Sequence, residues 1–217
     1  MSADKPRSPS SARGLSKEKI VLAAIELMES LGEAGFSLRK LGLQMGCDPM
    51  AVLYHFTSKD GLNRAMADWL TAQLVEVDAN QPWDCRLHDL AHQYRRLALK
   101  YPNTFGLMQR FLHTGMADFR LIETTHRAFR DAHIAEQDIP KMSLTWHATV
   151  YGLAMAEIGG LIRQATAEDL IEVEQLSDLD FPLTRQLMPL YATLDTDATF
   201  ELALDIWHEG VRKQACR

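Results

Sequence analysis

The stretch Phe36–Lys59 reads FSLRKLGLQMGCDPMAVLYHFTSK and contains two short helix signals separated by a glycine. Ser37 and Asp48 are small polar residues placed to cap helices, because their side chains can accept hydrogen bonds from the free N–H groups of a first turn. Gly46 stands where the first helix must end, in a left-handed conformation that glycine adopts without strain. The spacing therefore predicts one short helix over residues 38–45 and a second that begins just after Asp48.

A longer helix is expected before this pair, over residues 17–31. Ser16 is placed to cap it and Gly32 to end it, and its apolar residues recur at helical spacing. This stripe consists of Ile20, Ala23, Ala24, Leu27, Met28 and Leu31. Three helices with a tight glycine turn form a helix-turn-helix module, whose last helix enters the DNA major groove. Residues 15–60 are therefore predicted to be a DNA-binding domain.

Helical periodicity divides the second short helix into two faces. The face expected to pack on the other two helices consists of Ala51, Val52, His55 and Phe56. The opposite face consists of Pro49, Met50, Leu53 and Tyr54. Because this outer face has no Arg, Lys, Asn or Gln, we expect base recognition through thymine methyl groups, through Arg39 or Lys40 of the preceding helix, and through DNA shape.

The residues that carry a family resemblance are the run from Ser37 to Gly46, the triplet Tyr54-His55-Phe56, and Ser58-Lys59. They resemble the DNA-binding domain of tetracycline-repressor-like (TetR family) regulators over about residues 15–70. In that family a tyrosine and a histidine at the end of the recognition helix, with the lysine that follows, hold DNA phosphates. The resemblance implies this role for His55 and Lys59. It also implies the role for Tyr54, although Leu53 stands at the family's usual tyrosine position and Tyr54 occupies the next one.

The complete set expected to contact DNA combines the cap residues, the outer face and the phosphate-binding residues. It consists of Ser37, Arg39, Lys40, Asp48, Pro49, Met50, Leu53, Tyr54, His55 and Lys59. Gly42 stands where the family usually has alanine, which loosens its helix slightly but permits close packing. Structural roles are the alternative: His55 could be a core histidine, Tyr54 an interface aromatic, and Lys59 a solvated lysine. A cation at a helix start opposes the helix dipole, which favours a phosphate beside Lys59.

Charge is unevenly distributed along the 217 residues. Residues 1–59 contain eight Lys and Arg against six Asp and Glu, a net charge of +2, so the remainder must carry −8 to reach the total of −6. An acidic surface repels phosphate, so the protein is expected to touch DNA at one end only. Residues 1–14, rich in Ser, Pro and Arg, are expected to be a disordered basic arm that lies along a groove, or simply a flexible tail.

Residues 61–217 are long enough for a second core and are predicted to be an all-helical regulatory, ligand-binding and dimerisation domain. Helices are expected over about residues 58–80, 87–101, 103–112, 116–133, 140–164 and 197–213. No segment alternates as a strand would. The fold class is therefore all-α, with a helix-turn-helix domain connected by a fourth helix to a helical bundle.

Two helices of this domain have more apolar surface than one domain needs. The 140–164 helix combines large apolar residues with glycines and alanines, and the 197–213 helix is amphipathic. We therefore expect a homodimer through a four-helix bundle, as paired operator half-sites require. The Phe181-Pro182-Leu183 turn and residues 197–210 also resemble the family's C-terminal ligand domain. That resemblance implies a repressor released from double-stranded DNA by a small-molecule effector of unknown identity.

Aromatic and polar residues that could line an effector pocket occur in two places. They are Met108, Phe111 and His113 in one segment, and Trp146, His147, Tyr151 and Met155 in another. Ordinary core packing explains the same residues. If the pocket exists, the fourth helix is expected to transmit effector binding to the DNA-binding domain. The two recognition helices of a dimer must lie about one DNA turn apart, and a movement of the fourth helix would change their separation.

Other function classes have little support. His88 and His92 are one helical turn apart, but no third metal ligand stands at a fixed spacing, so no metal is expected. No phosphate loop or nucleophile elbow occurs, so neither catalysis nor a cofactor is expected. The alternative is a metal-binding or enzymatic helical protein whose helix-turn-helix serves protein contacts. The three cysteines are expected to be buried free thiols. No secretory signal or membrane helix is recognised, and the protein is expected in the cytoplasm.

Overall fold

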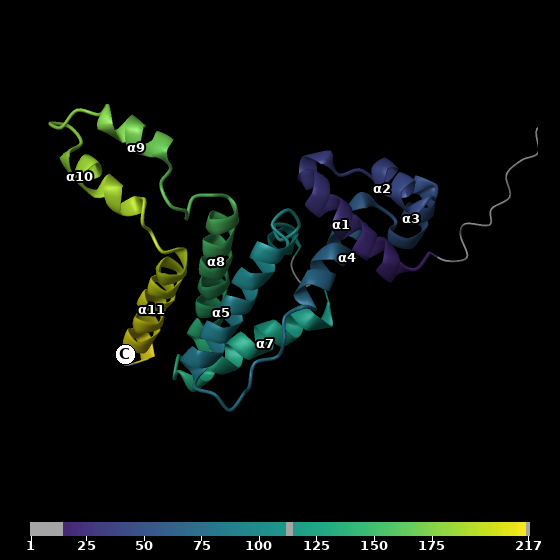
Figure 1. Ribbon diagram of the computed structural model, residues 1–217. Helices are drawn as coiled ribbons and strands as arrows, with labels where there is room; N and C mark the ends of the chain where they lie inside the picture. Colours follow the sequence, from purple (N-terminus) through teal and green to yellow (C-terminus); the bar gives the residue numbers. More distant parts are fainter. Residues whose placement is uncertain (1–14, 112–114, 216–217) are drawn as a thin grey trace, which may run out of the picture. The chain divides into compact units, whose positions relative to one another are not determined.

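The computed structural model describes residues 15–111 and 115–215, and every regular element within these ranges is a helix (Figure 1). The first group of helices is α1 (Lys17–Gly35), α2 (Leu38–Met45), α3 (Pro49–Phe56) and α4 (Lys59–Thr71). The others are α5 (Trp83–Lys100), α6 (Leu107–Arg110), α7 (Met116–Asp131), the 3-10 helix η2 (Glu136–Asp138), α8 (Ile139–Ile158), α9 (Ala167–Glu174), α10 (Pro182–Tyr191) and α11 (Thr196–Ala215). The all-α prediction is confirmed.

The chain divides into two compact units. Unit 1 contains the described residues up to Val75 together with Lys100–Leu121. Unit 2 contains Glu76–Leu99 and the described residues from Ile122 onward. Unit 1 extends beyond the expected boundary at residue 60, because α4 packs against both α1 and α6.

The capping predictions in unit 1 are confirmed. Ser16 Oγ accepts a hydrogen bond from Lys19 N–H at 3.3 Å, and Ser37 Oγ accepts one from Lys40 N–H at the same distance. Gly46 ends α2 in the left-handed conformation, with φ 64° and ψ 31°. These interactions are local in sequence, so short polar and glycine signals were sufficient to locate the helix ends.

The core of unit 1 is formed where α1 to α4 converge. Its fully buried side chains include Ile20, Met28, Leu41, Val52, Leu62 and Met66, each with 0 % exposure. Removing one such side chain from water contributes roughly 1.5–3 kcal/mol. The expected burial of Leu31 is wrong, since this residue is 44 % exposed. It lies at the kink where Gly32 leaves helical geometry, after which α1 resumes and ends at Gly35.

Unit 2 is built around α5, which lies beside α8 and α11 in Figure 1. The buried apolar side chains of α5 include Leu87, Leu90, Ala91, Tyr94 and Ala98. Trp146 and Val150 of α8 and Phe200 and Leu204 of α11 complete this core. Each of the three helices therefore presents one apolar face to the other two.

Some predicted helix bounds are wrong. The helix expected to reach residue 80 ends at Thr71, and the one expected over 103–112 is reduced to α6, after a run of turns. The helix expected to reach residue 164 ends at Ile158, before a glycine pair. The Phe181-Pro182-Leu183 turn opens α10, with Pro182 at its first position. Helices α9 and α10 were not predicted, because most of their residues stay exposed and show no long apolar stripe.

Candidate nucleic-acid interface

The turn between α2 and α3 depends on a close approach at Gly42. A Cβ atom added there would lie 2.8 Å from the carbonyl oxygen of Cys47 and 3.1 Å from Cδ of Pro49. Cys47 N–H also donates a hydrogen bond of 2.9 Å to the Gly42 carbonyl. The glycine thus allows α3 to cross α2 with Pro49 packed against it. Pro49 is consequently half-buried and is not a fully exposed member of the outer face.

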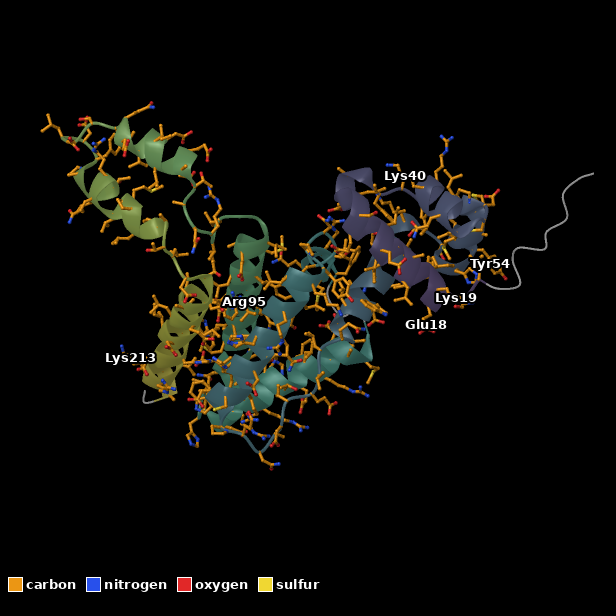
Figure 2. All side chains as sticks on the ribbon, in the orientation of Figure 1. Glu18, Lys19, Lys40, Tyr54, Arg95 and Lys213 are labelled. Carbon is orange, nitrogen blue, oxygen red and sulfur yellow. The ribbon has the colours of Figure 1, made fainter. Side chains whose placement is uncertain are left out.

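The start of α3 is fixed by Asp48, whose Oδ1 accepts a hydrogen bond of 2.7 Å from Met50 N–H. Val52 is fully buried, whereas Met50 is 68 % exposed and Tyr54 is 87 % exposed. Tyr54 lies at the edge of unit 1 in Figure 2. Leu53 is half-buried, so the surface that α3 offers to a partner is formed chiefly by Met50 and Tyr54. This exposed apolar pair is suited to contact with thymine methyl groups.

Helix α2 adds positive charge near this surface through Arg39 and Lys40, which are both exposed. Lys40 Nζ donates a hydrogen bond of 2.8 Å to the Gly35 carbonyl, so its side chain is directed back along the preceding loop. Arg39 therefore remains the better placed of the two for an Arg–guanine or Arg–phosphate contact. Ser37 caps the same helix with its hydroxyl and positions both cations.

His55 and Lys59 occupy the end of α3 and the start of α4. The His55 ring is half-buried and meets the Tyr54 ring edge-on, with centroids 5.6 Å apart. Lys59 is exposed, and its Nζ lies 5.5 Å from the centre of the Phe36 ring.

The turn from α3 to α4 contains a residue that sequence reasoning missed. Thr57 has φ 67° and ψ −35°, a conformation that is unfavourable for a β-branched side chain. Ser58 follows, and its Oγ accepts a hydrogen bond of 2.9 Å from Gly61 N–H to start α4. The turn therefore sets the direction in which His55 and Lys59 leave the backbone. Because threonine favours other conformations, its identity offered no signal of this turn.

The two cysteines that the structure describes, Cys47 and Cys85, are free thiols. Cys47 is half-buried, and burial together with the charge of Asp48 raises the pKa of its thiol. A raised pKa leaves less of the reactive thiolate near neutral pH, which favours a packing role. Cys85 is exposed, so the expectation that all the cysteines are buried is wrong for this residue. Cys216 lies outside the described residues.

In unit 2, four aromatic residues of α5 and α8 are in contact. The Tyr94 ring lies 6.2 Å from Trp146, 6.2 Å from His147 and 5.0 Å from Tyr151, measured between centroids. Trp146 is 1 % exposed, and its Nε1 has no hydrogen-bond partner among the described residues. His147 Nδ1 lies 2.8 Å from the Ser143 carbonyl oxygen. Tyr94 is not among the residues that the sequence suggests for a pocket, and its place in this aromatic cluster comes from the tertiary structure.

The remaining effector-pocket candidates are placed as follows. Met155 is half-buried on α8 in unit 2. Met108 and Phe111 belong to unit 1, where Met108 is 5 % exposed and the Phe111 ring lies 5.4 Å from the Arg64 guanidinium. His113 lies outside the described residues. Of the seven candidates, the structure brings together Trp146, His147 and Tyr151 around Tyr94.

The fold and the exposed face of α3 define a helix-turn-helix protein with a second, all-helical part. A family model described as the C-terminal domain of tetracyclin repressor-like proteins matches residues 77–215. This match covers more than half of the chain, which therefore belongs to the tetracyclin repressor-like family.

Similar proteins span nearly the whole chain. The class A tetracycline repressor from transposon 1721 of Escherichia coli is 23 % identical over 203 residues, 92 % of each protein. Apo ActR from Streptomyces coelicolor superposes with a TM-score of 0.78 at 18 % identity, over 93 % of this chain and 96 % of that one. BioQ, solved with its natural double-stranded DNA operator, superposes with a TM-score of 0.62 at 21 % identity, over 83 % of this chain and 99 % of that one. The two solved structures share the fold.

No helix in the described part of the chain is both long and apolar enough to cross a membrane.

Proposed function

We propose that this protein is a homodimeric transcriptional regulator that binds a palindromic operator through α3 and leaves it when a small molecule binds in unit 2. The exposed Met50 and Tyr54 face of a capped α3 is the observation that carries the proposal. Membership of the tetracyclin repressor-like family supports it. Repression follows from occupancy, because a dimer bound across a promoter excludes polymerase.

Each part of the interface has its own role in this proposal. Met50 and Tyr54 enter the major groove, and Arg39 of α2 reaches a base edge or a phosphate. His55 and Lys59 contact phosphates, which contribute affinity without sequence preference. Ser37 and Asp48 act through their caps, which hold the two short helices in register. The related fold of BioQ in its operator complex supports this arrangement.

Dimer formation is proposed to involve α8 and α11. Leu144 of α8 is 70 % exposed, and Leu202 and Ile206 of α11 are 60 % and 65 % exposed. Leu202 and Ile206 are one helical turn apart and form a single apolar face. A second copy of the same helices would cover these side chains in a four-helix bundle, with a two-fold axis that matches operator symmetry.

The effector is proposed to bind against the aromatic cluster of Tyr94, Trp146, His147 and Tyr151. Three large rings favour a flat, largely apolar molecule. A hydrogen-bond acceptor on that molecule would satisfy the buried Trp146 Nε1–H. ActR, which has a similar fold, has been solved with actinorhodin, and the class A relative is a tetracycline repressor.

The proposal assigns no catalytic role to any residue and places the protein in the cytoplasm, where a bacterial-type operator is accessible. The competing function is a helix-turn-helix used only for protein contacts. Salt dependence separates the two, because phosphate contacts release counterions and binding then weakens steeply as salt rises.

The first experiment measures binding of the purified protein to labelled DNA from upstream of its own gene at two salt concentrations. A His55→Ala, Lys59→Ala double variant is compared with a His126→Ala, Lys213→Ala control that removes the same residue types from unit 2. We expect tight, salt-sensitive binding that the first variant loses and the control retains. Equal binding by both variants, after random-sequence selection of the best site, would contradict the assigned interface.

A further inference from the structure

Two helices of unit 2 bring together two histidines and a glutamate. His88 and His92 lie one turn apart on α5, with ring centroids 4.5 Å apart. Glu201 of α11 faces both: its Oε2 is 2.8 Å from His88 Nε2, and its Oε1 is 2.7 Å from His92 Nε2. One possible ligand atom from each residue lies within 4.8 Å of the other two. The structure thus supplies the third ligand that the spacing of the histidines alone did not reveal.

Both imidazoles present Nε2 to the same carboxylate, one to each of its oxygens. Three possible ligand atoms that converge in this way from two helices can bind one cation.

The surroundings favour a cation. The three side chains line a pocket that also contains the acidic residues Glu76, Asp78 and Asp89, whereas Arg96 is its single basic residue other than histidine. The side chains remain accessible, with exposures of 38 % for His88, 21 % for His92 and 43 % for Glu201. Although His92 Nε2 itself is buried, an ion can reach His88 and Glu201 from solvent and keep water at its remaining positions.

We propose that His88, His92 and Glu201 form a binding site for a divalent transition-metal ion, with Zn²⁺ as the preferred class. Imidazole nitrogen suits zinc, nickel and copper, whereas magnesium and calcium prefer oxygen ligands. Two histidines and one carboxylate leave at least one coordination position for water or an anion. A histidine that binds the ion through Nε2 must carry its proton on Nδ1, so binding replaces the hydrogen bond between His88 and Glu201.

The metal would join α5 to α11 within unit 2. Phe200 and Leu204 of α11 already pack in that core, and the ion would add a polar attachment on the side of Glu201. Because metal binds the folded arrangement and not the separated helices, it is expected to raise the melting temperature in proportion to the logarithm of its concentration.

The test uses the full chain without an affinity tag, stripped with a chelator and titrated with ZnCl₂ by calorimetry, with MgCl₂ as a comparison. We expect one Zn²⁺ per chain, a rise in melting temperature, and no response to Mg²⁺. Glu201→Gln, His88→Ala and His92→Ala should each weaken Zn²⁺ binding at least roughly tenfold, since one of three ligands is lost. His126→Ala removes a partly exposed histidine of α7 and should bind as the wild type does.

Circular dichroism verifies that each variant is folded, and Glu201→Gln preserves side-chain shape if the alanine variants unfold. Co²⁺ provides a second measurement, because imidazole ligands change its visible absorption, and Glu201→Gln should need a higher Co²⁺ concentration for the same change. Lack of Zn²⁺ binding by the wild type would overturn the proposal. Equal binding by the wild type and the Glu201 variant would overturn it as well. DNA binding by stripped protein is measured separately, so this outcome is independent of the proposed regulator.

Discussion

The guanidinium of Arg95 and the carboxylate of Glu157 form two parallel hydrogen bonds that join α5 to α8. Nε donates to Oε2 at 2.6 Å and Nη2 donates to Oε1 at 2.7 Å, and both side chains are nearly buried. Asp197 of α11 accepts a third bond at 2.6 Å, and the Phe200 ring lies 4.9 Å from the guanidinium carbon. Arg95, which Figure 2 labels, thus links the three helices of the unit 2 core. The bonds to Glu157 outweigh burial and raise the pKa of Arg95.

Glu157→Ala should destabilise the protein by about 3 kcal/mol, because it leaves a buried guanidinium with one exposed partner. Urea denaturation measures the change. Glu123→Ala is the matched control, since Glu123 pairs with Arg127 on the surface of α7 and such pairs contribute about 0.3–0.5 kcal/mol. Similar losses in the two variants would show that the Arg95 network is not the stabilising feature described.

Gly42→Ala should destabilise the DNA-binding unit by about 1–3 kcal/mol and weaken operator binding, because the new Cβ would press on the Cys47 carbonyl and on Pro49. Gly210→Ala in α11 is the control, since its Cβ would meet nothing within 4 Å. Alanine there should stabilise the helix by about 0.5–1 kcal/mol. Thermal unfolding and DNA titration of both variants test the assignment, and unaltered stability in Gly42→Ala would refute close packing at the turn.

Stability should fall as the pH decreases below about 6.5, partly because of His208. This residue is 5 % exposed, and burial is the main cause that lowers its pKa; the charges of His88 and Arg212 act in the same direction, while Asp84 and Asp205 oppose them. The unfolded chain therefore binds a proton at a higher pH than the folded chain. The contribution of His208 to the free energy of unfolding is fully present above the pKa that this residue has in the unfolded chain. It is lost as the pH falls toward the lower pKa of His208 in the folded protein.

His208→Phe should reduce this pH dependence in denaturation curves recorded between pH 7.5 and 5.5. Part of the pH dependence of stability should persist in this variant, because burial also lowers the pKa of His92. His126→Gln serves as the comparison at a more accessible site. An identical pH dependence in His208→Phe and the wild type would exclude His208 as the responsible group.

Lys59→Ala should weaken binding to all DNA sequences alike and reduce the salt slope by about one, because a phosphate contact carries no sequence information. Met50→Ala should instead change the order of preferred sequences, because its side chain is placed to touch base edges. Selection from random DNA, repeated for both variants, measures each effect. A shared, sequence-independent loss in both would show that Met50 does not read bases.

The starts of the three helices in the DNA-binding module were predictable to the residue, whereas α1 continues to Gly35, past the end expected at residue 31. Ser16, Ser37 and Asp48 cap helices within three residues of their own positions, and Gly46 ends one by its own backbone conformation. Signals of this kind depend on neighbouring residues alone. The shorter helices α9 and α10 could not be predicted, because most of their residues are exposed and form no apolar stripe. A single local signal, the capping box of Thr166 and Asp169 at the start of α9, was too little to identify a helix.

The sequence by itself determined the helical class, the caps and the outward face of α3, because hydrogen bonds within a turn and the helical repeat act over a few residues. Only the tertiary structure decided which distant side chains meet. Glu201 is 113 residues from His88, and Glu157 is 62 residues from Arg95, so no local spacing reveals either pair. Such contacts form because the apolar faces of α5, α8 and α11 pack together, and the polar residues beside those faces are then brought within bonding distance.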